Sequence, residues 1–405
     1  MIKVLRGATL IDGTGAAPLP NSVIVIEGER IQRVGPAVDF GSQTPGGEQN
    51  VVDVSGSYVI PGMINCHEHL DNRRGFGSFQ QRAAQDPLYL ILRSARNALL
   101  SLQEGVTTVR DLASKQCTNL IIKQAINDGM IVGPRVFACG TAIAMTGGHG
   151  DEICLVADGV DEVRKAARTL LRAGADIIKV MGSGGYVTQG RDLPFSSQLT
   201  IEEMRAAFDE AHRAGKPTTV HAHPSPAVRA AIEAGVDCIE HGALLDLETA
   251  ELMASKGVFL VPTASESWMM AEHGVVWGRP KWLVESDRAH LGPRMEVLKQ
   301  CVRGGPKIAV GSDVIGDMVR EMLLLVEAGM TPMQAIEAAT RVGAEVLCQQ
   351  NDLGTVEPGK FADLVIVDGD PLVDLNALRN IKMVYKGGKA YDPQALAAAS
   401  GKWPL

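Results

Sequence analysis

Paired cysteines are missing from this sequence of 405 residues. Its seven cysteines form no Cys-x-x-Cys motif and are odd in number. They lie scattered along the chain at Cys66, Cys117, Cys139, Cys154, Cys238, Cys301 and Cys348. Such a set is typical of reduced, mostly buried thiols in a cytoplasmic protein, and not of a disulfide framework or a thiolate metal site. We therefore expect a cytoplasmic location.

Strong positive charge and long apolar runs are also missing. The formal net charge is −8 and no basic stripe or tail occurs, which argues against a nucleic-acid partner. No stretch approaches the roughly 18 uncharged apolar residues of a membrane span, so we expect no contact with a membrane. The first residues, MIKVLRGATLIDGTGA, lack the apolar region and cleavage site of a signal peptide.

Both ends of the chain are rich in short strands separated by turns. Residues 23–35 (VIVIEGERIQRVG) predict a hairpin, and residues 354–371 and 381–391 have the same pattern. We expect one small β-sandwich domain built from residues 1–60 and 353–393, and a tail over 394–405. The ends of the intervening segment, 61–352, would then lie close together, as those of a closed barrel do.

The middle of the chain alternates apolar strands with amphipathic helices. Three helical patterns end at Ala-Gly, a common helix stop. Eight strands are expected within residues 59–69, 105–112, 134–140, 176–181, 217–223, 237–242, 257–263 and 307–313. Strands that alternate with helices favour a parallel sheet, and eight such units favour an α/β fold of the TIM, or (β/α)8, barrel type. No GxGxxG follows an early strand, which disfavours a dinucleotide-binding fold.

Polar residues gather where these predicted strands end. In a (β/α)8 barrel the chemistry lies at the carboxyl ends of the strands. Residues two apart on a strand share a face, so His67 and His69 in INCHEHL can both point into the barrel mouth. Three further strands end in His221, His241 and Asp313. Imidazoles and a carboxylate that converge on one point suit a divalent transition metal such as zinc.

Two other residues beside these ligands have different expected roles. Lys179 ends the apolar segment ADIIK, where burial would lower its pKa and nearby cations would lower it further. A neutral amine there could react with carbon dioxide to form a carbamate, an anionic ligand able to bridge two metals. The residues permit this carbamate without requiring it. Glu240 directly precedes His241 on a strand, so alternation predicts that it points away from the mouth.

These motifs, in this order, resemble those of the amidohydrolase superfamily. The resemblance rests on PGMINCHEH, the lysine of IIKVMGSGG, VHAH, IEHG and GSD, and it covers nearly the whole chain. It implies a first metal bound by His67, His69 and Asp313. It implies a second metal bound by His221 and His241, and an N6-carboxylysine at Lys179 that bridges the two.

The resemblance also implies a mechanism. A bridging hydroxide would be the nucleophile, and Asp313 would take its proton and pass it to the leaving nitrogen. His149 and His223 are candidates for binding the substrate carboxylate or carbonyl oxygen. Tyr186 follows GSGG, where a pocket contact and a surface position stay equally open.

A closer similarity is to the imidazolonepropionase-like branch that contains Xaa-Pro and Xaa-Arg metallo-dipeptidases, mycotoxin amidases and phenylurea hydrolases. TGGHG, GSGG and AGVDCIEHG carry it. It implies a small-molecule amide or dipeptide substrate, two divalent metals, most simply zinc, and a homo-oligomer.

A tryptophan-rich segment bears on the substrate. Three of the four tryptophans lie within residues 268–282, after the seventh predicted strand and therefore on the catalytic face. With Met269 and Met270 they could form an apolar lid over a bulky or aromatic substrate. Packing onto the rim or a subunit contact explains them equally well.

The same residues also allow alternative functions to be compared. A hydrolase of a cyclic amide, aryl urea, carbamate or mycotoxin amide would use the same metals. A deaminase of this superfamily usually needs a glutamate after the fifth strand, and VHAHPSPAV has none. A non-catalytic scaffold is disfavoured because all six ligand positions are filled.

Overall fold

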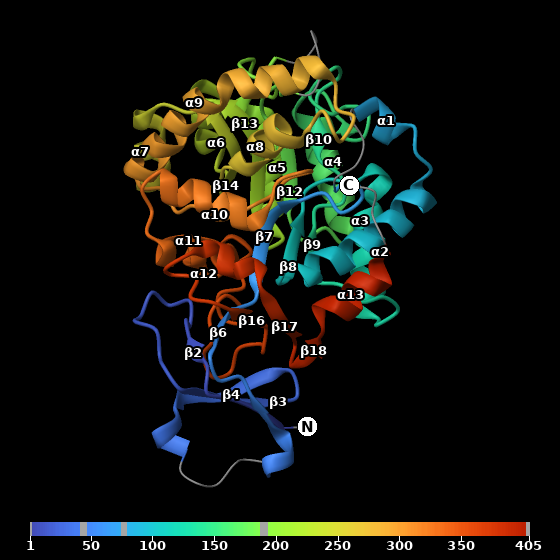
Figure 1. Ribbon diagram of the computed structural model, residues 1–405. Helices are drawn as coiled ribbons and strands as arrows, with labels where there is room; N and C mark the ends of the chain where they lie inside the picture. Colours follow the sequence, from blue (N-terminus) through green and yellow to red (C-terminus); the bar gives the residue numbers. More distant parts are fainter. Residues whose placement is uncertain (1, 41–46, 74–78, 187–192, 402–405) are drawn as a thin grey trace.

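The computed structural model describes residues 2–40, 47–73, 79–186 and 193–401 (Figure 1). The last residues of the expected tail, 402–405, lie outside the described part. Two parallel sheets occupy the middle of the chain, ordered β7-β8-β9 and β11-β10-β12-β13-β14-β15. Their strands are β7 (Met63–Glu68), β8 (Val106–Asp111), β9 (Arg135–Ala138), β10 (Ile143–Ala144), β11 (Leu155–Val156), β12 (Ile178–Met181), β13 (Thr218–Pro224), β14 (Cys238–Leu244) and β15 (Phe259–Val261). Seven of the eight predicted strands are therefore present.

The eighth predicted strand, over residues 307–313, is wrong as a regular strand. Ile308 makes an isolated bridge to Leu260 of β15, and Asp313 makes one to Glu68 of β7. The backbone bonds of this segment are divided between its two neighbours, because Ala309 N donates to Leu260 O (2.9 Å) while Asp313 N donates to His67 O (2.8 Å). Asp313 also has a positive φ of 55°, which ends the extended conformation. The segment nevertheless joins the edges of the two parallel sheets.

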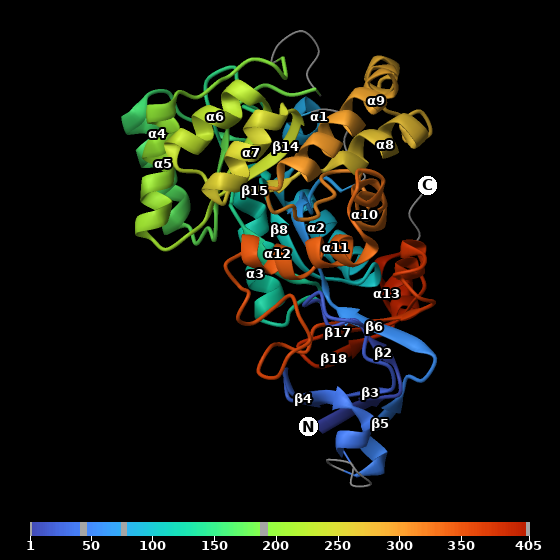
Figure 2. The same cartoon turned by 90° about the vertical axis from the view of Figure 1, so that its left-hand side faces the viewer.

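Helices surround the parallel sheets, and α8 and α9 lie at the end of the sheets that holds a cavity (Figures 1 and 2). The helices are α1 (Phe79–Ala83), α2 (Pro87–Gln103), α3 (Thr118–Asn127), α4 (Val160–Arg172), α5 (Ile201–Arg213), α6 (Ser225–Ala234), α7 (Leu247–Lys256), α8 (Ala264–His273), α9 (Lys281–Gly304), α10 (Met318–Glu327), α11 (Pro332–Ala338) and α12 (Arg341–Val346).

Helix α5 shows how the local sequence determines where a helix begins and which face it buries. A capping box between Thr200 and Glu203 begins it, and Met204, Ala207 and Ala211 form its buried stripe. No helix in the described ranges is both long and apolar enough to cross a membrane.

The two ends of the chain meet in two mixed sheets, ordered β4-β3-β1-β5 and β18-β17-β16-β6-β2. The strands are β1 (Ile2–Arg6), β2 (Thr9–Leu10), β3 (Ser22–Glu27), β4 (Arg30–Pro36), β5 (Val51–Asp53), β6 (Ser57–Pro61), β16 (Leu364–Asp368), β17 (Ile381–Lys386) and β18 (Lys389–Tyr391). Both sheets contribute to one apolar cluster that includes Ile24, Val59 and Ile366.

Figure 1 shows the blue N-terminal strands beside the red C-terminal ones, and β6 pairs antiparallel with β16. The predicted hairpin of residues 23–35 is confirmed as β3 and β4. Most of the expected tail forms helix α13 (Pro393–Ser400), which packs on α2.

Gly311 permits the close approach of three segments behind β7. A Cβ atom at this position would lie 2.6 Å from Val261 Cγ1 and 2.7 Å from His67 Cβ. We expect Gly311→Ala to lower the free energy of unfolding by about 1–3 kcal/mol through overpacking. Gly292→Ala is the matched control, because in the described part of the chain its added methyl group meets no heavy atom within 4 Å outside the backbone of α9 itself. Urea unfolding of both variants checks this, and a Gly311→Ala protein as stable as the wild type would contradict it.

Candidate metal centre

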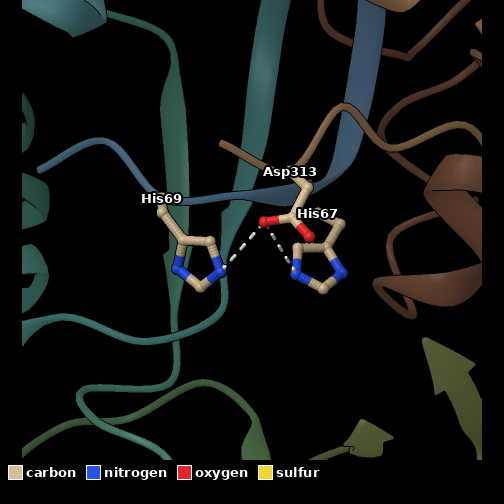
Figure 3. A group of neighbouring side chains, drawn as sticks. All are labelled: His67, His69 and Asp313. Atoms are coloured by element: carbon tan, nitrogen blue, oxygen red, sulfur yellow. Dashed lines mark ion pairs between the residues drawn. The ribbon is translucent and has the colours of Figure 1, made fainter. Parts of the chain in front are cut away.

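His67 of β7, His69 just after this strand and Asp313 form a compact group at the strand ends (Figure 3). Asp313 Oδ1 lies 3.4 Å from His69 Nε2 and 3.8 Å from His67 Nε2. One potential ligand atom from each of the three residues lies within 4.8 Å of the others. His67 and Asp313 are buried and His69 is half-buried, so the group is shielded from bulk water. Two imidazoles and one carboxylate form a donor set that fits a divalent metal.

Hydrogen bonds behind the rings fix which nitrogen faces this group. His69 Nδ1 lies 3.0 Å from Ala113 O, so Nδ1 must donate the bond. His67 Nδ1 lies 2.7 Å from Glu240 Oε2 and likewise donates. Nε2 of both rings therefore faces Asp313, and in a neutral ring it carries the lone pair that a metal-ligating histidine needs.

A second pair of histidines lies beside the first group. The ring centroids of His221 on β13 and His241 on β14 are 4.5 Å apart, and those of His67 and His241 are 4.9 Å apart. Lys179 on β12 is buried and borders the same cavity. The six predicted ligands therefore gather around one cavity, although they reach it from both parallel sheets.

Burial dominates the electrostatics of these side chains. It lowers the pKa of His69 to about 3 and that of His221 and His241 well below the usual range, with neighbouring cations and imidazoles lowering it further. Neutral imidazole is the form that binds a metal. Burial also lowers the pKa of Lys179, against the pull of Glu240. For Asp313 burial acts upward, but His67 and His69 outweigh it and hold its pKa at about 2.

Glu240 is not among the described residues that border the cavity, but the regular alternation expected of it is wrong, because its carboxylate lies inside the sheets against His67. Its carboxylate accepts the bond from His67 and also contacts Arg110 and Thr219. The alternation rule fails here because His241 has a positive φ of 72°, so the chain is not a regular strand at that residue. Sequence reasoning also missed Arg110, although an arginine inside the apolar segment VTTVRDL was a usable signal.

The three expected substrate contacts lie on one side of the cavity. His149 stacks on His221 with a centroid distance of 4.3 Å, and the Tyr186 ring lies edge-on to His223 at 4.9 Å. All three border the cavity, so the open choice for Tyr186 is decided in favour of a pocket contact. Arg294, which the sequence analysis did not single out, lies over the Tyr186 ring with Cζ 4.4 Å from the centroid.

The tryptophan-rich segment covers the cavity, but not with its tryptophans. Met270 borders the cavity from α8, together with charged residues of α8 and α9. Trp277 and Trp282 pack behind Met270 in an apolar cluster, and Trp268 belongs to the main core. The described residues of this wall are therefore a mixture of apolar and charged side chains, which include Glu266, Ser267, Arg279, Leu283, Asp287 and Arg294.

Comparisons with known proteins agree with this geometry. The model of the amidohydrolase family matches residues 58–391. The ochratoxinase of Aspergillus niger is 32% identical over 424 residues, which covers 96% of this chain and 86% of that enzyme. A solved prolidase complexed with N-methylphosphonate-L-proline has a TM-score of 0.89 at 32% identity, covering 97% of this chain and 100% of the other. A Xaa-Pro dipeptidase with methionine in its active site has a TM-score of 0.86 at 31% identity, covering 97% and 100%.

The α/β fold and the site define a hydrolase that acts on C–N bonds. The chain belongs to the amidohydrolase family. The group of His67, His69 and Asp313 is its candidate metal site.

Metal addition should stabilise the folded chain. An ion that binds only the folded state raises the free energy of unfolding, by about 2.7 kcal/mol at a free concentration 100 times its Kd. We expect this effect when Zn²⁺ is added to chelator-treated protein, measured by thermal and urea unfolding. Mg²⁺ should have far less effect, because it prefers oxygen ligands and this site offers mainly imidazole. An unchanged Zn²⁺ effect in a His69→Asn, Asp313→Asn double variant would contradict the assignment.

Proposed function

We propose that this chain is a binuclear metal-dependent hydrolase that cleaves the C–N amide bond of a dipeptide or an N-acyl amino acid. The observation that carries the proposal is the gathering of all six predicted ligands around one cavity. Similarity to a prolidase, a Xaa-Pro dipeptidase and an ochratoxinase supports it.

We also propose that the two parallel sheets form one (β/α)8 barrel. Support comes from the junctions between them: residues 307–313 bond both β15 and β7, and Asp176 N donates to Ala138 O of β9 (2.8 Å). Residues 61–352 would then be the catalytic domain, with a β-sandwich of residues 1–60 and 353–393 beside it.

The ligands divide between two metal positions in this proposal. His67, His69 and Asp313 would hold one ion, and His221 and His241 the other. Lys179 would lie between them as the N6-carboxylysine, formed when its neutral amine adds to carbon dioxide and releases a proton. Burial supports this step, because it disfavours the ammonium form of Lys179.

The side chains around the cavity suggest how the reaction proceeds. Two divalent ions would supply a water ionised at neutral pH and Lewis-acid polarisation of the scissile carbonyl. Asp313 faces the metal group, so it can accept a proton from the attacking water and deliver it to the leaving nitrogen. His149 and His223 border the same space and can donate hydrogen bonds to substrate oxygens. Because this space is shielded from bulk water, these electrostatic interactions would be stronger there than in solution.

A charged end of the cavity favours a substrate with a free carboxylate. Arg294 Nη1 donates to buried Asp287, while its Nε is buried and has no partner among the described residues. His223 Nδ1 is likewise buried without a partner. Both groups lie beside Tyr186, so a substrate carboxylate placed there would meet the Arg294 guanidinium and the polar edge of the His223 ring. This feature favours dipeptides and N-acyl amino acids over lactams and aryl ureas.

Removal of Lys179 tests the binuclear centre. We expect the metal content of purified protein to fall from about two ions per chain to one or fewer in Lys179→Ala, with loss of most amide hydrolysis, because the bridging ligand is gone. Metal analysis and single-turnover assays measure this. Lys386→Ala is the matched control, since Lys386 is a half-buried strand lysine that donates to Gly133 O, outside the cavity. A Lys179→Ala protein with two metals and full turnover would refute the bridge.

The substrate class is tested with a panel of Xaa-Pro and Xaa-Arg dipeptides, N-acyl amino acids, lactams and aryl ureas, each with and without chelator. Arg294→Met should lower kcat/KM for carboxylate-bearing amides by about 10–100-fold, and change little for the same amides with the carboxylate capped. Arg288→Met, on the same helix but bonded to Ala271 O, is the control. An equal loss on both kinds of amide would count against the carboxylate contact, and chelator-insensitive cleavage would count against the proposed function.

A further inference from the structure

A buried ion pair lies behind the candidate metal centre and has no part in the proposed reaction. Arg110 of β8 donates to Glu240 of β14, with Nη2 2.5 Å from Oε1. The two side chains are 1% and 0% exposed. Their strands belong to different parallel sheets, so the pair spans the interior between those sheets.

Two hydrogen bonds connect this pair to His67, and others connect it to Thr219 and Cys238. Glu240 Oε2 accepts the Nδ1–H of His67 at 2.7 Å, while Oε1 accepts from Arg110 and Thr219. Arg110 Nε also donates to the carbonyl oxygen of Cys66, the residue directly before His67. The pair therefore holds His67 twice, once through its ring and once through the preceding peptide.

We infer that Glu240, itself fixed by Arg110, is the positioning residue that sets the tautomer and ring orientation of His67. A proton held on Nδ1 leaves the Nε2 lone pair free for a metal, and the bond direction fixes the plane of the ring. This inference rests on the proposed metal site and adds to it a residue that is not itself a ligand.

A purely structural role would have different consequences. If the pair only tied β8 to β14, its loss would lower stability and leave metal affinity unchanged. A positioning role predicts weaker metal binding in protein that is still folded, because the ring would be free to turn or to carry its proton on Nε2.

Two substitutions of Glu240 separate these roles. Glu240→Gln has a single acceptor oxygen, so it cannot serve both His67 and Arg110. Glu240→Asp keeps the charge for Arg110 but is one methylene too short to reach Nδ1 as well. Glu210→Gln is the matched control, since Glu210 is also a largely buried carboxylate paired with arginines, on α5 and outside the cavity.

The measurements are the Zn²⁺ affinity by competition with a chromophoric chelator and the visible spectrum of the Co²⁺-loaded protein. We expect both Glu240 variants to bind Zn²⁺ about 10–100-fold more weakly and to shift the Co²⁺ absorption bands, with Glu210→Gln like the wild type. Circular dichroism confirms folding before each titration.

Wild-type affinity and spectrum in a folded Glu240 variant would overturn the inference while the proposed function stands. If Glu240→Gln does not fold, Glu240→Asp decides alone. A wild-type protein that binds neither ion would overturn both the inference and the proposed function.

Discussion

The cost of burying charge is the constraint on which the rest of this structure depends. A lysine, an arginine, a glutamate and several imidazoles share the space inside two parallel sheets. An ionised group there is tolerated only with a partner, and removal of one member of a buried pair typically costs about 3–5 kcal/mol. Arg110 and Glu240 satisfy this rule for each other. For His69, His221 and His241 burial lowers the pKa and so favours the neutral ring, which is also the state that binds metal.

The imidazole rings also need a fixed orientation, which hydrogen bonds to their Nδ1 atoms provide. His69 is held by a backbone carbonyl, His67 by Glu240, and His241 by the hydroxyl of Thr263, whose oxygen lies 2.7 Å from Nδ1. Each support comes from a different segment of the chain. The orientation of the imidazole rings therefore depends on the assembled sheets, and no single strand determines it.

Sequence reasoning identified the strands and most of the polar strand ends because the signals are local. An apolar run followed by His-x-His, or a helix that stops at Ala-Gly, needs no knowledge of distant residues. It failed where geometry departs from the regular period. His241 and Asp313 both adopt positive φ, so alternation misplaced Glu240 and the segment 307–313 did not pair as a strand. Arg294 was missed because nothing in the local sequence of its helix indicates that its side chain contacts Tyr186, more than 100 residues earlier in the chain.

The pairing of β6 with β16 has a consequence for how the site comes into being. Strand β7, which carries His67, follows β6 after the single residue Gly62. Strand β6 lies in its sheet between β2 and β16, and β16 begins only at Leu364. During synthesis the chain therefore releases every candidate ligand, from His67 to Asp313, before the strand that completes the anchor of β7 exists. A chain truncated before Leu364 would thus retain all the candidate ligands while the sheet that anchors β7 lacked the β16 partner of β6.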